Sequence, residues 1–206
     1  MRHGILITEA MESPIQDVND GCDWALDYAI DNAVDLFVWD GDGMGVSLKR
    51  QIDLSLKGKH TEFYMYRGSE GVENPTEIYQ EIGKKGQERT NEDTFKNKRA
   101  QYHWSIRDRF YNTYLAVVKG EYTDPDKLIS LSSDITHLQQ LRAEMCRIPR
   151  KPNGAGLIQI MGKEEMKNRH KISSPNIADS VIMAFQSKGE KKKSRKPMTI
   201  DTKGIV

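Results

Sequence analysis

The chain has 206 residues, of which 37% are hydrophobic and 30% charged, and its 31 basic and 30 acidic residues leave a formal net charge of +1. The mean hydropathy is −0.69, no apolar run approaches the roughly 18 residues of a membrane span, and no signal-peptide core follows Met1. This composition excludes an integral membrane protein and a strongly polybasic or polyacidic one. We expect one soluble, intracellular domain of ordinary size.

The cysteines and the C-terminal charges add two further expectations. Cys22 and Cys146 lie far apart, and neither has a cysteine or histidine at the spacing of a zinc site. We therefore predict neither a zinc site nor a disulfide scaffold. Residues 188–196 hold six Lys or Arg against one Glu, which is typical of a solvated tail and less often of a phosphate-binding arm. We predict a domain over residues 1–187 and a flexible basic tail over residues 188–206.

The first third of the chain alternates strand and helix patterns. In order, it predicts a strand over 4–8, a helix from Asp17 or Asn19 to about Ala33, a strand over 36–39, a helix over 46–56 and an aromatic strand over 63–66. The first strand has nothing before it that could form the first arm of a hairpin. The alternation favours an α/β fold with a crossover connection.

The most informative stretch is LFVWDGDGMG, residues 36–45. Four apolar residues run without interruption to Asp40, and glycines follow at positions 41, 43 and 45. A short apolar run bounded by turn residues predicts a strand that is buried on both faces. Functional groups of open α/β sheets lie just beyond the carboxyl ends of such strands. Asp40 and Asp42 stand at that edge, and the glycines let a backbone, a metal or a phosphate approach closely.

The rest of the chain is less regular. Residues 67–97 are poor in apolar side chains, which predicts a long surface excursion facing the substrate. A helix over 98–118 mixes aromatic residues with arginines, which favours packing of its aromatic side chains on the sheet over a platform for stacking bases. The remaining predicted elements are a turn at Asp124-Pro125, a helix over 135–143 capped by Asp134, a hairpin of strands 144–150 and 157–161, a polar connection over 164–169, and a helix capped by Ser174, with Pro175 at its first position, that runs to about Phe185.

Asp179 is the only charged residue between Ser173 and Ser187. A helix that is apolar on nearly all sides is buried, and a carboxylate inside it needs a partner or a metal. Pairing with an arginine or with backbone donors explains a lone buried aspartate as well as a functional role does. Together with Asp40, however, it forms a pair of carboxylates that would repel each other without a cation between them. Such a pair is typical of divalent-metal phosphodiester chemistry.

Three other interpretations of Asp40-Gly41-Asp42-Gly43 can be compared with their motifs. An EF-hand loop fails, because its fifth position is Met44 and its twelfth is Gln51. A dinucleotide fingerprint fails, because it requires glycine at Val46. The nucleophile motif of haloacid-dehalogenase-like phosphatases fits locally, with Asp40 as the nucleophile, but the later acidic pair of that family is not seen. This phosphatase remains the alternative function.

Four stretches in order, RHGILI, VWDGDGMG, KNKRAQYHWSIRDRF and SSPNIADSVIMAF, resemble the nuclease domain of the large terminase subunit of tailed bacteriophages. The resemblance spans roughly residues 2–186. It implies an RNase H-like fold, with a mixed central sheet flanked by helices, a C-terminal hairpin and a catalytic helix. It also implies an endonuclease that cuts concatemeric double-stranded phage DNA with two Mg²⁺ or Mn²⁺ ions, in the cytoplasm of the bacterial host, with the portal protein and the small terminase subunit as partners.

The resemblance also implies site residues. Asp40 matches the acid at the end of a central strand and Asp179 the acid of the C-terminal helix, both catalytic as metal ligands. Asn176 stands where relatives often have Asp or His, so it is a supplementary metal ligand weakened to a neutral amide oxygen. Asp42 is also counted with the metal site, where it is expected to support the ligands. Basic residues around the site would hold DNA by its phosphates; the candidates are Lys49, Arg50, Lys84, Lys85 and Arg99.

One departure concerns the start of the chain. The first metal-binding aspartate of the family lies on the strand that precedes RHG, whereas this sequence starts at Met1, inside that hairpin, and it contains no Walker A motif. We expect weak metal binding and little or no nuclease activity from this chain by itself. Besides the nuclease and the phosphatase, a non-catalytic module that docks on a packaging partner stays open.

Overall fold

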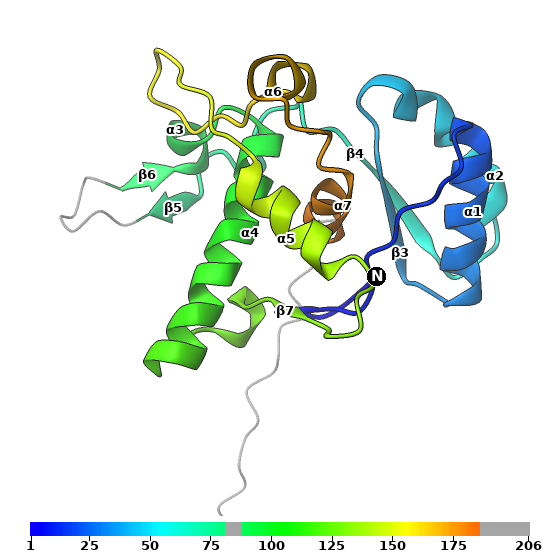
Figure 1. The fold of residues 1–206 in the computed structure, drawn as a ribbon, viewed down its shortest axis with the longest axis horizontal. Coiled ribbons are helices and arrows are strands. Elements are labelled where there is room, and N and C mark those ends of the chain that lie inside the picture. Colours follow the sequence, from blue (N-terminus) through cyan, green and yellow to red (C-terminus); the bar gives the residue numbers. More distant parts are fainter. Residues whose placement is uncertain (81–87, 186–206) are drawn as a thin grey trace, which may run out of the picture.

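The computed structural model describes residues 1–80 and 88–185 as a mixed α/β structure (Figure 1). Apart from the first predicted strand, its N-terminal third follows the predicted order of strands and helices. The elements are β1 (Arg2–His3), β2 (Leu6–Ile7), α1 (Val18–Asp31), β3 (Leu36–Asp40), a 3-10 helix η1 (Gly43–Leu48), α2 (Lys49–Leu56) and β4 (Glu62–Tyr66). Asp17 caps α1 by accepting hydrogen bonds from the backbone N–H groups of Asn19 and Asp20, at 2.8 and 3.0 Å.

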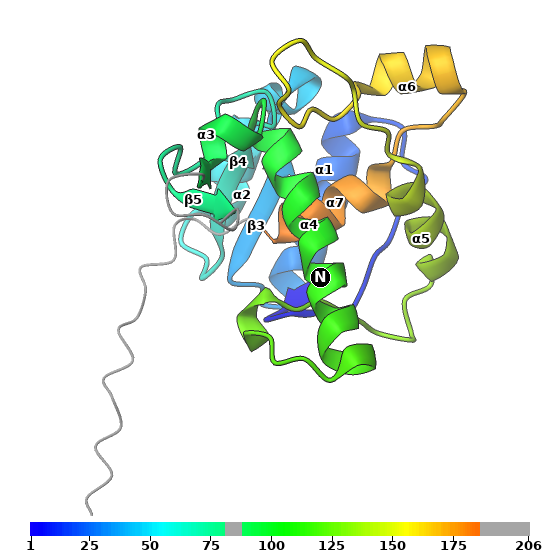
Figure 2. The ribbon, with the colours of Figure 1, turned by 90° about the vertical axis from the view of Figure 1, so that its left-hand side faces the viewer.

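The remaining two thirds are mainly helical. The elements are β5 (Ile78–Gln80), β6 (Arg89–Thr90), α3 (Asn91–Thr94), α4 (Lys98–Tyr114), a π-helical turn η2 (Leu115–Lys119), a 3-10 turn η3 (Pro125–Lys127), β7 (Ser130–Leu131), α5 (Leu138–Arg147), α6 (Lys163–His170) and α7 (Asn176–Ala184). The long helix α4 runs beside α7, as Figure 2 shows from the side. No helix of residues 1–80 and 88–185 is long and apolar enough to cross a membrane.

The described strands form three small sheets. β1 and β2 are antiparallel, and β2 also pairs in parallel with β7. β3 and β4 are parallel over five residues each and are joined through α2, which is the predicted crossover. β5 and β6 form an antiparallel ribbon. Within the described residues, the predicted single mixed central sheet is therefore replaced by three separate small sheets.

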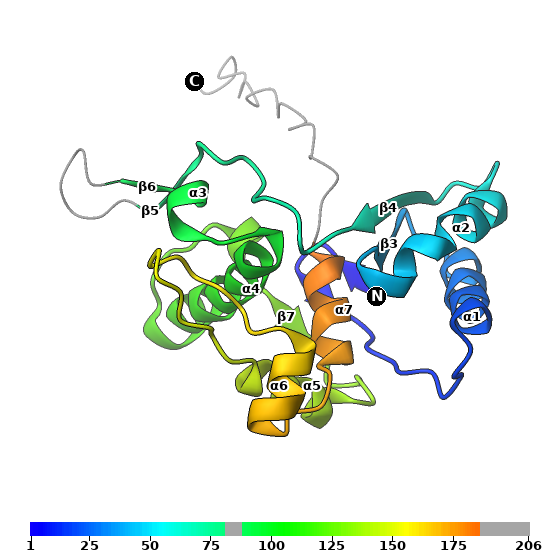
Figure 3. The same cartoon turned by 90° about the horizontal axis from the view of Figure 1, so that it is seen from above.

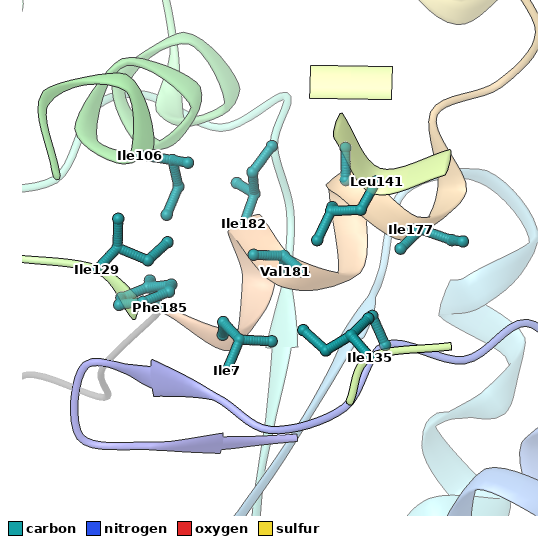
Figure 4. Close-up of a cluster of buried hydrophobic side chains, with 11 residues drawn as sticks. Ile7, Ile106, Ile129, Ile135, Leu141, Ile177, Val181, Ile182 and Phe185 are labelled. Carbon is teal, nitrogen blue, oxygen red and sulfur yellow. The ribbon is translucent and has the colours of Figure 1, made fainter. Parts of the chain in front are cut away.

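Helix α7 lies at the centre of the molecule, between α4 and α5 on one side and β3 on the other (Figure 3). Its apolar face packs into the largest core cluster, together with side chains from the β1–β2 hairpin, α4 and α5 (Figure 4). A second cluster, made of Cys22, Leu26, Trp39, Ile52 and Leu56, joins α1, β3 and α2. These two cores hold the end of β3 and the first turn of α7 in fixed positions.

Three predicted elements near the C-terminus need correction, the first of them only in its bounds. The helix predicted over 135–143 begins at Leu138 and continues to Arg147, because Leu138, Leu141 and Met145 recur at helical spacing and pack on the core around α7. It therefore includes half of the first strand of the predicted hairpin. That hairpin is reduced to one bridge between Arg150 and Ile160, since Pro149 and Pro152 have no N–H to donate. The polar connection over 164–169 is helix α6.

Corrections also apply at the start of the chain and between 67 and 97. Arg2–His3 forms the first arm of a hairpin with Leu6–Ile7, which was not expected. Residues 67–80 and 88–97 do not form the predicted surface excursion throughout. Asn91, Thr94 and Phe95 are buried, and the ring of Tyr79 lies 4.8 Å from that of Phe95. The last helix begins at Asn176, with Pro175 rather than Ser174 in the capping position.

Among the glycines of residues 1–80 and 88–185, Gly45 is the one at which a side chain is least tolerable. A Cβ there would lie 1.7 Å from the carbonyl oxygen of Asp40. We expect Gly45→Ala to lower the free energy of unfolding by about 1–3 kcal/mol, because the backbone after β3 has to move. Gly21→Ala is the matched control: nothing lies within 4 Å of its Cβ position, and alanine in a helix should stabilise α1 by about 0.5–1 kcal/mol. Urea unfolding of both variants measures the contrast, and equal effects would contradict this role of Gly45.

Candidate functional site

The end of β3 and the first turn of α7 bring Asp40 and Asp179 within reach of one lysine. The ammonium nitrogen of Lys163, at the start of α6, lies 2.9 Å from Oδ2 of Asp179 and 3.9 Å from Oδ2 of Asp40. The two aspartates are 139 residues apart in sequence. A cation between two carboxylates removes the repulsion that they would otherwise exert on each other. The fold thus gathers the two acids that the sequence singled out.

Asp179 is the buried member of the pair, with a side chain that is 14% exposed. Two residues of α4 face it from the other side: Nε2 of His103 lies 3.5 Å and the guanidinium of Arg99 3.9 Å from its Oδ1. Burial by itself raises the pKa of this carboxyl, but His103, Lys163 and Arg99 outweigh burial and lower the pKa to about 2. Asp179 is therefore an ionised, buried carboxylate throughout the neutral range.

Asp42 binds the chain after β4. Its carboxylate accepts hydrogen bonds from the backbone N–H of Ser69, at 3.0 Å, and from the Ser69 hydroxyl, at 2.7 Å. Its own backbone N–H donates to Oδ1 of Asp40 at 3.0 Å. Asp42 thus ties the loop after β3 to the loop after β4 and helps to orient Asp40.

A small cavity opens between these groups. Its lining consists of Asp40, Asp42, Tyr66, Gly68, Arg99, His103, Asp179, Ile182 and Met183. The Tyr66 hydroxyl is buried there without a hydrogen-bond partner among the described residues, and burial raises its pKa. A Cβ on Gly68 would come within 3.0 Å of that hydroxyl and of the Arg99 side chain. Gly68 therefore keeps the cavity open at this point.

The other predicted site residues lie in different surroundings. Asn176 sits one turn before Asp179, where its amide donates to Glu12 at 3.4 Å. Lys49 and Arg50 are exposed at the start of α2. Arg99, predicted as a DNA contact, is largely enclosed beside Asp179. Lys84 and Lys85 lie outside the described residues, as does the tail predicted over 188–206.

Sequence reasoning missed Lys163 and His103. Lys163 was assigned to no element, and only the fold brings α6 over the end of β3. A signal for His103 was available, because Arg99 and His103 are four residues apart and therefore share one face of the predicted helix. That face points at Asp179.

The donor set can be tested against a divalent cation. Two carboxylates already surround a cationic group, and carboxylate oxygens are the ligands that Mg²⁺, Mn²⁺ and Ca²⁺ prefer. Within residues 1–80 and 88–185 no group of three or more His, Cys, Asp or Glu side chains could hold a metal ion, but ions such as Mg²⁺ bind through one or two carboxylates and keep several waters. The described residues therefore fit a divalent cation through Asp40 and Asp179, with its remaining ligands supplied by water or by groups outside this set.

The chain was compared with protein-family models, with curated proteins and with solved structures, and matches were found among the solved structures. No protein-family model matches the sequence, and no curated protein matches it either. Among solved structures, the chain is similar to the nuclease domain of the large terminase subunit gp2 of bacterial virus Sf6, with 40% identity and a TM-score of 0.84 over 90% of this chain and 80% of that one. A single-residue variant of that domain with manganese has a TM-score of 0.83 at the same identity, covering 90% of this chain and 81% of that one. The same variant with calcium also has a TM-score of 0.83 at 40% identity, over 90% and 80% of the two chains.

Proposed function

Because the chain belongs to the nuclease domains of bacteriophage large terminase subunits, we propose that it is a metal-dependent endonuclease domain that cuts concatemeric double-stranded DNA during packaging. The observation that carries the proposal is the meeting of Asp40 and Asp179 across a cation. Structures of a single-residue variant of the Sf6 domain are with manganese or with calcium, which supports divalent metal use here. The same proposal includes an RNase H-like fold, two Mg²⁺ or Mn²⁺ ions in the site, and action in the bacterial cytoplasm. Its partners would be the portal protein and the small terminase subunit.

Asp40 and Asp179 are the residues that would hold the metal. Bound there, a divalent ion would supply an activated water and stabilise the leaving oxygen of a phosphodiester. Asp179 is suited to this role because its low pKa keeps it ionised at neutral pH. Asp42 holds the loop that carries Asp40 by binding Ser69. Lys163 and Arg99 keep positive charge beside the carboxylates, where it would attract the phosphate of a DNA strand.

The proposed DNA surface rests on exposed basic residues. Lys49 and Arg50 follow η1, the helix that continues from the Asp40 loop. Contacts from such residues to phosphates position a duplex without reading its sequence. Lys84 and Lys85 remain candidates from the sequence, and Asn176 remains a candidate supplementary ligand beside Asp179. Arg99 is better placed to act on the phosphate at the cut than on a distant one, since it lies beside Asp179.

The test is cleavage of linear and supercoiled double-stranded DNA by an excess of the chain, in Mn²⁺, in Mg²⁺ and in EDTA. We expect slow cutting that requires the divalent ion, since the described residues supply only two carboxylates. A parallel assay measures hydrolysis of p-nitrophenyl phosphate. Turnover of the phosphomonoester without cleavage of DNA would favour the phosphatase with Asp40 as nucleophile. Neither activity, with no effect of Mn²⁺ on the melting temperature, would favour a non-catalytic packaging module.

Lys163 should compete with a metal for the two carboxylates. In Lys163→Ala, the metal-free protein loses an ion pair with Asp179, so its unfolding free energy should fall by on the order of 1 kcal/mol. The rise in melting temperature on adding Mn²⁺ should instead become larger than in the parent chain, because the ion no longer has to displace an ammonium group. Lys167→Ala, at an exposed position one turn further along the same helix, is the control. Equal Mn²⁺ effects in all three proteins would show that Lys163 does not occupy the metal position.

A further inference from the structure

Lys98, at the start of α4, is a buried charge that the metal site itself does not use. It is the only charged residue that is buried in the described part of the chain, with 5% of its surface exposed. Its ammonium group donates to Oε2 of Glu70 at 2.9 Å and to the Tyr64 hydroxyl at 3.3 Å, and it lies 3.4 Å from Oε1 of Glu73. Burying an ammonium group costs about as much free energy as its ion pairs return. Stability by itself therefore does not explain why a lysine stands here.

Both acidic partners of Lys98 belong to residues 67–73, the segment that leaves β4. The first turn of α4 also holds this segment through its backbone. The N–H of Lys98 donates to the carbonyl oxygen of Glu70, and the N–H of Arg99 to that of Gly68, both at 2.9 Å. The first N–H groups of a helix have no partner within the helix. The ion pairs of Lys98 thus reinforce an attachment that these free backbone donors already make.

The same segment reaches the proposed metal site through Ser69. The N–H and the hydroxyl of Ser69 bind the carboxylate of Asp42, and the N–H of Asp42 donates to Oδ1 of Asp40. A continuous series of contacts therefore leads from Lys98 to one of the two acids proposed to hold the metal.

The start of α4 also contacts the other acid. Arg99, the residue after Lys98, lies 3.9 Å from Oδ1 of Asp179, and His103, one turn later, lies 3.5 Å from the same atom. One helix thus contacts Asp179 directly and Asp40 through residues 67–73. Because a helix is rigid over one turn, the separation of the two carboxylates depends on how tightly this segment is held against α4.

We propose that Lys98 is a positioning residue of the nuclease: by binding Glu70 and Glu73, it fixes Asp40 relative to Asp179 so that both can bind one divalent ion. This inference rests on the proposed function and adds a residue to it that touches neither metal nor DNA. Groups that support metal ligands change metal affinity or activity by about 10–100-fold when they are removed, so the effect is large enough to measure.

Lys98→Met tests the proposal, because methionine nearly matches the length of lysine without its charge. Glu70 and Glu73 are 49% and 32% exposed, so water can reach the carboxylates that are left behind. In EDTA, we expect the amide hydrogens of Ser69 and Asp42 to exchange at least about tenfold faster than in the parent chain.

Thr113→Val is the matched control for a loss of stability in α4. The Thr113 hydroxyl joins the far end of the helix to the backbone of Ile129. Its loss should lower the melting temperature, but it should leave the exchange of the Ser69 and Asp42 amides at the parent rate. If circular dichroism shows Lys98→Met to be unfolded, Glu70→Gln, which removes a charge from a half-exposed position, takes its place.

DNA cleavage provides the second readout. Lys98→Met should raise the Mn²⁺ concentration for half-maximal cleavage about tenfold or more, whereas the KM for DNA should stay at the parent value, because no DNA contact is removed. Unchanged amide exchange, an unchanged Mn²⁺ requirement in a chain that cleaves, or equal changes in Thr113→Val would each overturn the proposal. Absence of Mn²⁺-dependent cleavage in the parent chain would instead refute the nuclease, and amide exchange would still decide whether Lys98 holds the segment that orients Asp40.

Discussion

Asp179→Asn and Asp40→Asn should each reduce Mn²⁺-dependent DNA cleavage more than roughly 100-fold, since each removes a charged oxygen ligand from the proposed metal site. The loss should come from metal affinity as well as from turnover, because an amide oxygen carries no net charge. Single-turnover cleavage across a series of Mn²⁺ concentrations separates the two contributions. The double variant should be little worse than either single one, since both residues serve the same site.

Substitutions of two further aspartates serve as comparisons for the loss of cleavage. Asp42→Asn should reduce cleavage less than Asp40→Asn, because Asp42 binds Ser69 and only orients the neighbouring loop. Asp53→Asn makes the same chemical change at an exposed position of α2 and should leave cleavage unchanged. Full cleavage activity in Asp179→Asn would show that Asp179 is not a metal ligand, whatever the effect of the substitution on stability.

The stability of the protein should depend on the ionisation of Asp179. The pKa of its carboxyl is about 2 in the folded protein against an ordinary 3.8, so the folded state binds fewer protons than the unfolded state between these values. The corresponding stabilisation is about 2 kcal/mol. It is fully present above about pH 4 and disappears as the pH falls through about 2. Asp179→Asn should therefore cost about 2 kcal/mol at neutral pH and nothing near pH 2.

Urea unfolding of the parent chain and of Asp179→Asn, from about pH 2 to about pH 7 without metal, measures this difference. Asp53→Asn, at an exposed position of α2, provides the background pH dependence. A difference between parent and Asp179→Asn that stays constant down to the lowest pH would show that the carboxylate is not held by His103, Lys163 and Arg99. A larger cost at neutral pH is consistent with the cations left unpaired in the variant.

Local chemistry explains which elements were predicted correctly. The apolar run ending in Asp40, the Asp17 cap of α1 and the long aromatic helix α4 each carry their signal within a few neighbouring residues. The failures share another cause. Residues 144–147 include the good helix formers Glu144, Met145 and Arg147, and packing of α5 against α7 keeps them helical where a strand was predicted. The short arms Arg2–His3 and Leu6–Ile7 form strands only because they pair with each other and with β7.

The sequence by itself determined the identity of the two acids. Asp40 ends an uninterrupted apolar run and Asp179 interrupts an apolar helix, so burial and charge single them out without any knowledge of the fold. It also determined the crossover from β3 to β4 through α2. Only the tertiary structure decided which groups face these acids. Lys163, Arg99 and His103 come from two other helices, and their distances to Asp179 depend on how α4, α6 and α7 pack. Packing over such separations is set by the sum of many weak contacts, which no short stretch of sequence contains.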